Sequence, residues 1–117
     1  DFSFMSTMDV YSLFGNAVDN AIEAVRKLDN PAQKTVDIKT GRIGSMITIT
    51  VTNYFAGSIR LKDGLPATTK QAEAGFHGFG MKSMQMIAEK YHGSLQTDVE
   101  NDLFTLVIYL FDEASSS

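Results

Sequence analysis

The chain has 117 residues, the length of a single ordinary domain, with 44% hydrophobic and 21% charged residues. Its formal net charge of −4 argues against a nucleic-acid-binding surface, and its lack of cysteine excludes disulfides, thiolate metal sites and a cysteine nucleophile, as fits a reducing cytosol. No apolar run approaches the roughly 20 residues that cross a bilayer, so this stretch of chain is not expected to span a membrane.

The first predicted elements are a short strand and a long amphipathic helix. Phe2 and Phe4 alternate with polar neighbours, which is typical of a strand. The helix is predicted over 10–28, with Asp9 as its N-cap and Asp29-Asn30-Pro31 as its end, because proline disfavours helical geometry in the residue before it. Apolar residues at steps of three and four give the helix one face for a core: Val10, Leu13, Phe14, Ala17, Val18, Ala21, Val25 and Leu28.

Two asparagines stand on the flank of this predicted helix. Asn16 and Asn20 are one turn apart, and at about 100° per residue they border the apolar stripe rather than oppose it. Asparagine has only a moderate helix propensity, so two asparagines one turn apart inside a helix indicate a specific role. One interpretation is interhelical hydrogen bonding or a solvated flank; the other is a metal and phosphate site, since a neutral amide oxygen can ligate Mg²⁺. The spacing alone leaves both open.

The middle of the chain predicts a hairpin followed by a lid. Val36 and Ile38 alternate with polar neighbours in a strand that turns through 41–44. A clearer strand follows over 46–53, with apolar residues on one face and threonines on the other. The stretch 54–76 has little periodicity and several glycines. A loop of that length in a compact domain is either a functional lid or a disordered insertion, and we expect a lid.

A second amphipathic helix and a second hairpin complete the domain. Two glycines, at 78 and 80, lead into this helix, which ends at Gly93. Its apolar face is predicted to consist of Met81, Met84, Ile87, Ala88 and Tyr91. A strand over 95–99 then pairs with a long apolar strand over 103–111, which is predicted to be central because both of its faces carry large residues.

The order of these elements predicts an α+β fold. Strands arrive in hairpin pairs with helices between the pairs, which indicates a two-layer sandwich with a mixed, mostly antiparallel sheet covered on one face by helices. We expect one domain over 1–113 and a disordered tail over 114–117.

The glycines at 75, 78 and 80 precede or open the second helix. Glycines there let the backbone come close to a ligand, and the free amides and positive dipole end of a helix attract an anion such as phosphate. A plain tight turn has the same pattern. No βαβ unit surrounds the stretch and no Gly-Lys-Ser/Thr occurs, so neither a Rossmann site nor a Walker loop is expected. Four basic and two acidic residues over 54–82 make this the segment expected to meet an anion.

Two motifs together resemble one superfamily. Asn16-Ala17-Val18-Asp19-Asn20-Ala21-Ile22-Glu23-Ala24 resembles the N box of the GHKL superfamily, the Bergerat ATP-binding fold of gyrase, heat-shock chaperone, mismatch-repair and histidine kinase proteins. His77-Gly78-Phe79-Gly80-Met81-Lys82-Ser83 resembles its second glycine box. The resemblance covers essentially the whole chain. It is greatest to the catalytic domains of quorum-sensing, peptide-receptor sensor histidine kinases, in which Thr-Thr-Lys precedes the glycine box, as Thr68-Thr69-Lys70 does here.

One motif departs from the superfamily pattern. Most members carry Asp-x-Gly-x-Gly after the strand, and that aspartate accepts a hydrogen bond from the adenine amino group. Here the sequence is Asn53-Tyr54-Phe55-Ala56-Gly57, and the peptide-receptor kinases also carry Asn. An amide oxygen accepts the same bond without charge assistance, so we expect Asn53 to read adenine more weakly. An ordinary strand-ending residue is the alternative for Asn53.

The resemblance implies a Mg-ATP site. It makes Asn20 the Mg²⁺ ligand, with Asn16 supporting the metal one turn earlier. It puts Lys70 on the lid, where its charge would offset that of the β and γ phosphates, so Asn16 and Lys70 are the expected catalytic residues. Glu23, on the same side of the helix, either orders metal-bound water or is solvated. Besides Asn53 and these residues, the nucleotide is expected to meet the glycine box: His77, Gly78, Phe79, Gly80, Met81 and Lys82.

The resemblance also implies an activity and its partners. The γ-phosphoryl group would pass to a histidine on a separate dimerisation domain, absent from this fragment, and signalling would continue to a response regulator. The fragment alone would not phosphorylate itself. A start at Asp1 without methionine suggests a piece of a larger protein, expected to be the cytoplasmic portion of a membrane-anchored sensor. The alternatives are a protein serine kinase resembling an anti-sigma factor, and a pseudokinase that uses ATP only as a conformational ligand.

Overall fold

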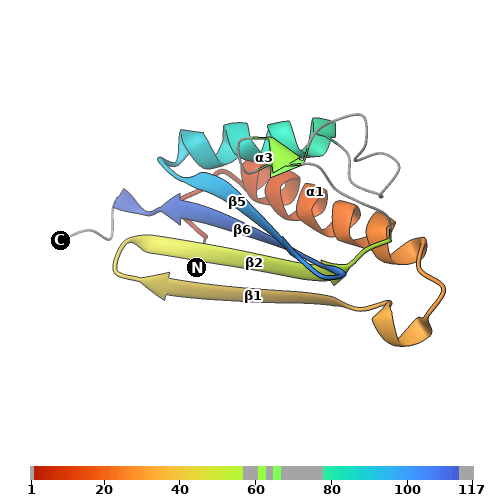
Figure 1. The fold of residues 1–117 in the computed structure, drawn as a ribbon. Helices are drawn as coiled ribbons and strands as arrows, with labels where there is room; N and C mark the ends of the chain where they lie inside the picture. Colours follow the sequence, from red (N-terminus) through yellow and green to blue (C-terminus); the bar gives the residue numbers. More distant parts are fainter. Residues whose placement is uncertain (1, 57–60, 63–64, 67–77, 114–117) are drawn as a thin grey trace.

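The computed structural model describes residues 2–56, 61–62, 65–66 and 78–113. Two helices, α1 (Thr7–Arg26) and α3 (Gly78–Lys90), cover one face of a four-stranded sheet (Figure 1). The strands are β1 (Val36–Ile43), β2 (Met46–Tyr54), β5 (Ser94–Glu100) and β6 (Leu103–Phe111), in the order β1-β2-β6-β5. A 3-10 helix, η1 (Pro31–Gln33), precedes the sheet, and β3 (Leu61–Lys62) pairs with β4 (Leu65–Pro66). The predicted two-layer α+β sandwich is confirmed.

Every strand pair of the described sheet is antiparallel. In β2 the residues of the helix-facing side are buried and the threonines of the other side are half-buried, as the alternation predicts. β6 lies between β2 and β5, so its predicted central place is confirmed. The predicted turn over 41–44 is too early. β1 continues to Ile43, and the chain turns at Gly44, which has a φ of +60°, and Ser45.

The hydrophobic core lies between the helices and the sheet. α1 packs mainly on β2, and α3 packs on β5 and β6. Both helices contribute small residues or methionines, which lets them lie close to the branched and aromatic side chains of the strands. The members that are less than 5% exposed are Leu13, Ala17, Ala21, Ala24, Ile47, Ile49, Val51, Met81, Met84, Ala88, Phe104, Leu106, Ile108 and Leu110.

The N-terminal segment forms a turn, so the predicted strand at Phe2 and Phe4 is wrong. The amide of Met5 donates to the carbonyl of Phe2 at 3.0 Å, which closes the turn. The Phe2 ring packs edge-on against Phe14, and the Phe4 ring packs in the same way against Tyr91. The alternation therefore reflects two aromatic contacts with the helical layer rather than pairing in the sheet.

The ends of both helices differ from the prediction. α1 begins at Thr7, and its N-cap is Ser6, whose hydroxyl accepts from the amide of Asp9 at 3.1 Å. α3 ends at Lys90, and His92 takes the left-handed conformation there. Glycine is required at position 93 by packing and not as the helix end, because a Cβ there would lie 1.7 Å from a backbone oxygen of β6. No helix in the described part of the chain is long and apolar enough to span a membrane.

Candidate functional site

A pocket of about 330 Å³ opens where α1 passes the first turn of α3. Its described lining consists of Asn16, Asp19, Asn20, Ile22, Glu23, Arg26 and Gly80. All of these except the glycine lie on α1, at spacings that give a helix one continuous flank beside its buried face. The structure therefore brings the two predicted asparagines together with one glycine of the glycine box.

Asn20 is the most unusual residue of this lining. It is only 4% exposed, and its Nδ2 is buried without a hydrogen-bond partner among the described residues. A buried polar group without a partner costs roughly 1–3 kcal/mol. Turning the amide over exchanges nitrogen and oxygen, so the position can present either a donor or an acceptor to a ligand. An unpartnered amide in the wall of a pocket is what a binding site for a cation or a polar ligand requires.

Gly80 determines how closely α3 approaches the asparagines. A Cβ on Gly80 would lie 3.4 Å from Oδ1 of Asn16 and 3.5 Å from Nδ2 of Asn20. A larger side chain would therefore occupy the space in front of both amides. The first-turn amides of a helix lack intrahelical acceptors, so this end of α3 directs backbone donors and the positive end of the helix dipole toward the same space.

Asn16 is held in place by its own helix. Its Nδ2 donates to the hydroxyl of Ser12, one turn earlier, at 3.4 Å. That bond uses the nitrogen and leaves the oxygen on the side of Gly80. Both asparagines can thus offer an oxygen to the space beside α3, and neutral amide oxygens are suitable ligands for Mg²⁺.

The described charges of the pocket do not favour a bare anion. Asp19 and Glu23 contribute carboxylates, and Arg26 lies 3.5 Å from Glu23 in an ion pair. With both acids ionised, the described lining carries one net negative charge. A polyphosphate would therefore need a cation to enter with it. The predicted basic residues do not change this balance, because Lys82 is exposed outside the described lining and Lys70 lies outside the described residues.

The other predicted site residues have separate environments. Asn53 is 2% exposed on the helix-facing side of β2, and its Nδ2 donates to the carbonyl of Tyr54 at 2.9 Å. Its Oδ1 therefore remains available to accept a hydrogen bond. Asn53 is not part of the described lining of the pocket. Met81 is 2% exposed in the core, so only its backbone is available to a ligand. Gly78 and Phe79 begin α3, and His77 lies outside the described residues.

Sequence reasoning missed a polar cluster at the opposite ends of the two helices, which we call the Asp9 clasp (Ser6, Asp9, Lys90 and Tyr91). Oδ2 of Asp9 accepts from Lys90 at 2.8 Å and from the hydroxyl of Tyr91 at 2.6 Å. The Tyr91 oxygen in turn accepts from the amide of Ser6 at 3.0 Å. The clasp joins the start of α1 to the end of α3, so it fixes the two helices that form the pocket.

The Asp9 clasp should make stability depend on pH. The hydrogen bonds from Lys90 and then Tyr91 lower the pKa of Asp9. Since the folded pKa is below the ordinary aspartate value of about 4, this stabilisation is complete above that value and is lost as the pH falls through the folded pKa. We expect Asp9→Asn to lower the free energy of unfolding by about 1 kcal/mol at neutral pH.

Urea unfolding from neutral pH down to about pH 3 measures this difference. The difference in the free energy of unfolding between wild type and Asp9→Asn should become smaller as the pH falls. Asp98→Asn, an exposed aspartate on β5, serves as the matched control and should show no comparable effect. A gap that stays constant with pH would show that the Asp9 carboxylate charge does not stabilise the fold.

Comparison with known proteins gives one family. The family model described as GHKL domain matches residues 5–111, which is most of the chain and includes every element from α1 to β6. A search of curated proteins found no match. The family match covers both helices that form the pocket.

Proposed function

Because the chain belongs to the GHKL family of ATP-binding domains, we propose that it binds Mg-ATP in the pocket between α1 and α3 and transfers the γ-phosphoryl group to a histidine. The acceptor would lie on a separate dimerisation domain, and the phosphoryl group would pass on to a response regulator. In this proposal the domain is the cytoplasmic catalytic part of a sensor histidine kinase.

The observation that carries the proposal is the unpartnered amide of Asn20. A buried amide in an otherwise apolar helix face lowers stability unless a ligand binds it. In the same pocket Gly80 leaves space in front of this amide, and the first turn of α3 lies beside it. A metal ion would bind the amide oxygen of Asn20. Phosphate oxygens would occupy the space beside Gly80 and contact the first turn of α3.

The residues of this chain have distinct roles in the proposal. Asn20 and Asn16 would hold Mg²⁺, which would neutralise phosphate charge that the acidic lining does not. The backbone amides at Gly78 and Gly80 would hold phosphate oxygens. Glu23, held by Arg26, would accept hydrogen bonds from metal-bound water. Lys70 would add positive charge at the transferring phosphate.

The described residues favour an acceptor that comes from outside the domain. His92 is at the far end of α3 from the pocket, and its Nε2 lies 3.3 Å from a carboxylate oxygen of Glu113. Asn16 is a neutral amide with no useful basicity, so it would not activate water beside the proposed phosphate position, which favours phosphoryl transfer over hydrolysis. This supports a kinase whose substrate docks at the mouth of the pocket.

The transfer is tested by mixing the domain with radiolabelled Mg-ATP and the histidine-bearing dimerisation domain encoded with it. Label on the acceptor that is stable to alkali and labile to acid is the expected result. Acid-stable label on serine would instead indicate a protein serine kinase. Bound nucleotide without any labelled acceptor would identify a pseudokinase. The domain alone should retain no stable label.

We propose that Oδ1 of Asn53 accepts a hydrogen bond from the adenine amino group. Its Nδ2 is already bonded to the carbonyl of Tyr54, so its oxygen is oriented as an acceptor. We expect Asn53→Ala to weaken ATP binding roughly tenfold, the effect of one buried hydrogen bond, and to change GTP binding much less. Calorimetry with both nucleotides measures this. Equal affinity of the unmodified domain for ATP and GTP would show that Asn53 does not read the base.

A further inference from the structure

Strand β1 is an open edge of the sheet. Within the described residues β1 pairs with β2 alone, and Figure 1 shows it as the outermost strand. Every β1 residue after Val36 is exposed. An edge strand of this kind has a row of backbone amides and carbonyls with no partner in the sheet, which another extended strand can join.

The two faces of β1 differ in chemistry. Ile38 is paired with buried Val51, so it faces the helical layer, yet it is 44% exposed. Asp37 and Lys39 point to the opposite, helix-free face. Their charged atoms lie 3.9 Å apart, and both side chains are well exposed. The edge thus carries an apolar residue on one face and two opposite charges on the other.

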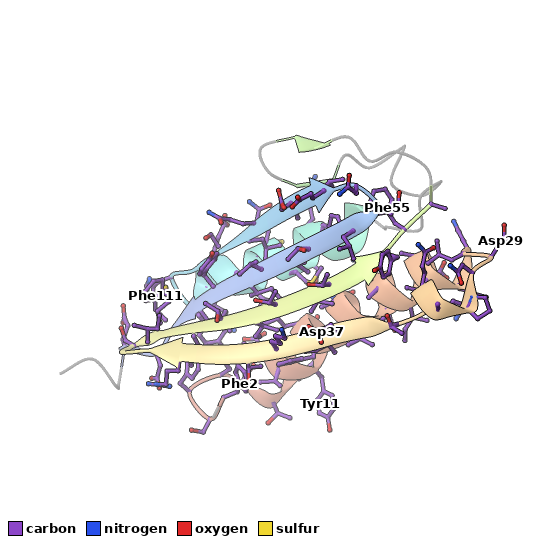
Figure 2. All side chains as sticks on the ribbon, turned by 60° about the horizontal axis from the view of Figure 1, so that its bottom comes forward. Phe2, Tyr11, Asp29, Asp37, Phe55 and Phe111 are labelled. Carbon is purple, nitrogen blue, oxygen red and sulfur yellow. The ribbon has the colours of Figure 1, made fainter. Side chains whose placement is uncertain are left out.

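The flank of α1 nearest this edge is apolar and partly exposed. Tyr11 and Val18 are seven residues apart, so they lie along one line of the helix. Tyr11 is 76% exposed and Val18 is half-buried, and Figure 2 shows Tyr11 projecting from the molecule on the same side as Phe2. The nucleotide pocket is centred on the other flank of α1, where α3 lies.

We propose that two copies of this domain associate through β1, by antiparallel pairing of β1 with its copy about a two-fold axis at Ile38. The four-stranded sheets then join into one continuous sheet. Ile38 lies opposite the partner's Ile38. The Tyr11 and Val18 flanks of the two α1 helices face each other across these two isoleucines.

Charge complementarity selects this register over its neighbours. With Ile38 at the axis, Asp37 is directly opposite the partner's Lys39, and the symmetry repeats the pair. Moving the axis by one residue in either direction would place Asp37 opposite the partner's Asp37, or Lys39 opposite the partner's Lys39. Opposite charges stabilise a directly facing pair and like charges destabilise it, so only the Ile38 register is favourable in both pairs.

The expected association is weak. The paired segment is short and its charges are exposed, so the buried area is below that of a typical permanent dimer. Both pockets open on the flanks that face away from the axis. The proposal goes beyond nucleotide binding and is tested without nucleotide, so its failure leaves the proposed function untouched.

Sedimentation equilibrium of the whole domain, up to millimolar concentration, tests the proposal. The unmodified domain should form a dimer reversibly. Asp37→Lys places a lysine opposite the partner's Lys39 in both symmetry-related pairs. It should raise the dimer dissociation constant by at least about tenfold. The double variant Asp37→Lys with Lys39→Asp restores both pairs in reversed order and should restore the dimer.

The controls separate this interface from others. Glu89→Lys is a charge reversal on exposed α3 and should leave association unchanged. The chain lacks cysteine, so Ile38→Cys should give a disulfide-linked dimer on mild oxidation, whereas Thr40→Cys, which faces the partner's Val36, should not. A monomer at every concentration would overturn the proposal. A dimer that Asp37→Lys does not weaken, or that the double variant does not restore, would also overturn it.

Discussion

Replacing Asn20 by alanine should weaken binding of ATP in Mg²⁺ at least about tenfold, because even second-shell partners of a metal site are worth about 10- to 100-fold in affinity. The side chain has no partner among the described residues and lies in the wall of the pocket. The loss should be much smaller in EDTA, since an amide that acts through the metal contributes little once the metal is removed.

The same substitution should not destabilise the free domain. Removing a buried amide that lacks a partner removes its desolvation cost, which offsets the small loss of packing. Urea unfolding without nucleotide should give a free energy of unfolding equal to or above that of the wild type. Asn30→Ala, at the exposed N-cap of η1, is a control for nucleotide affinity alone, because the Asn30 side chain accepts from the amide of Ala32 at 3.0 Å and its loss should lower stability. Equal loss of affinity with and without Mg²⁺, or a clear loss of stability, would assign Asn20 to packing.

Asn16→Glu should raise basal ATP hydrolysis by about tenfold. General-base assistance is typically worth about 10² to 10⁴ in rate, but only with correct geometry, so we expect an effect below this range. Asn16 lies one turn before Asn20, and its oxygen lies on the side of Gly80. A carboxylate there would stand beside the proposed phosphate position, where it could orient and deprotonate water. A kinase benefits from the amide, because a base would spend ATP on water before the acceptor docks.

Phosphate release at saturating Mg-ATP measures this effect, and nucleotide affinity is measured separately because the added charge could repel the triphosphate. Asn16→Gln keeps the amide in a longer side chain and is the matched control, with no expected gain in hydrolysis. Retained binding without faster hydrolysis would show that a base at this position does not reach the attacking water.

The layers of the fold were predictable because the periodicity of the sequence is strong. The periodicity of α1 and the alternation along β2 indicate most of the residues that enter the core, but Val18, predicted on the apolar face, lies outside the core cluster. The strand predicted at Phe2 and Phe4 is wrong because alternation also arises when two aromatic rings pack on separate elements, here Phe14 on α1 and Tyr91 just after α3. The end of β1 was placed too early because Gly41 reads as a turn residue, whereas it pairs with Thr48 inside the ladder.

The candidate site was predictable only in part. Asn16 and Asn20 stand out from their spacing, and the same spacing could have indicated Asp19, Glu23 and Arg26 as further lining residues. The closeness of Gly80 to the asparagines depends on how two distant helices pack, which no local pattern records. The Asp9 clasp depends on the same packing, since it joins residues more than 80 positions apart.

The central claim is that the pocket between α1 and α3 binds adenine nucleotide together with a metal ion. Calorimetric titration of the domain with a non-hydrolysable ATP analogue, in Mg²⁺ and in EDTA, tests it most directly. Because the ligand is small and flexible, we expect saturable binding of one nucleotide per domain in the micromolar range or weaker. Binding should be clearly stronger with Mg²⁺ than without it. No binding in either condition, or the same affinity in both, would contradict the claim.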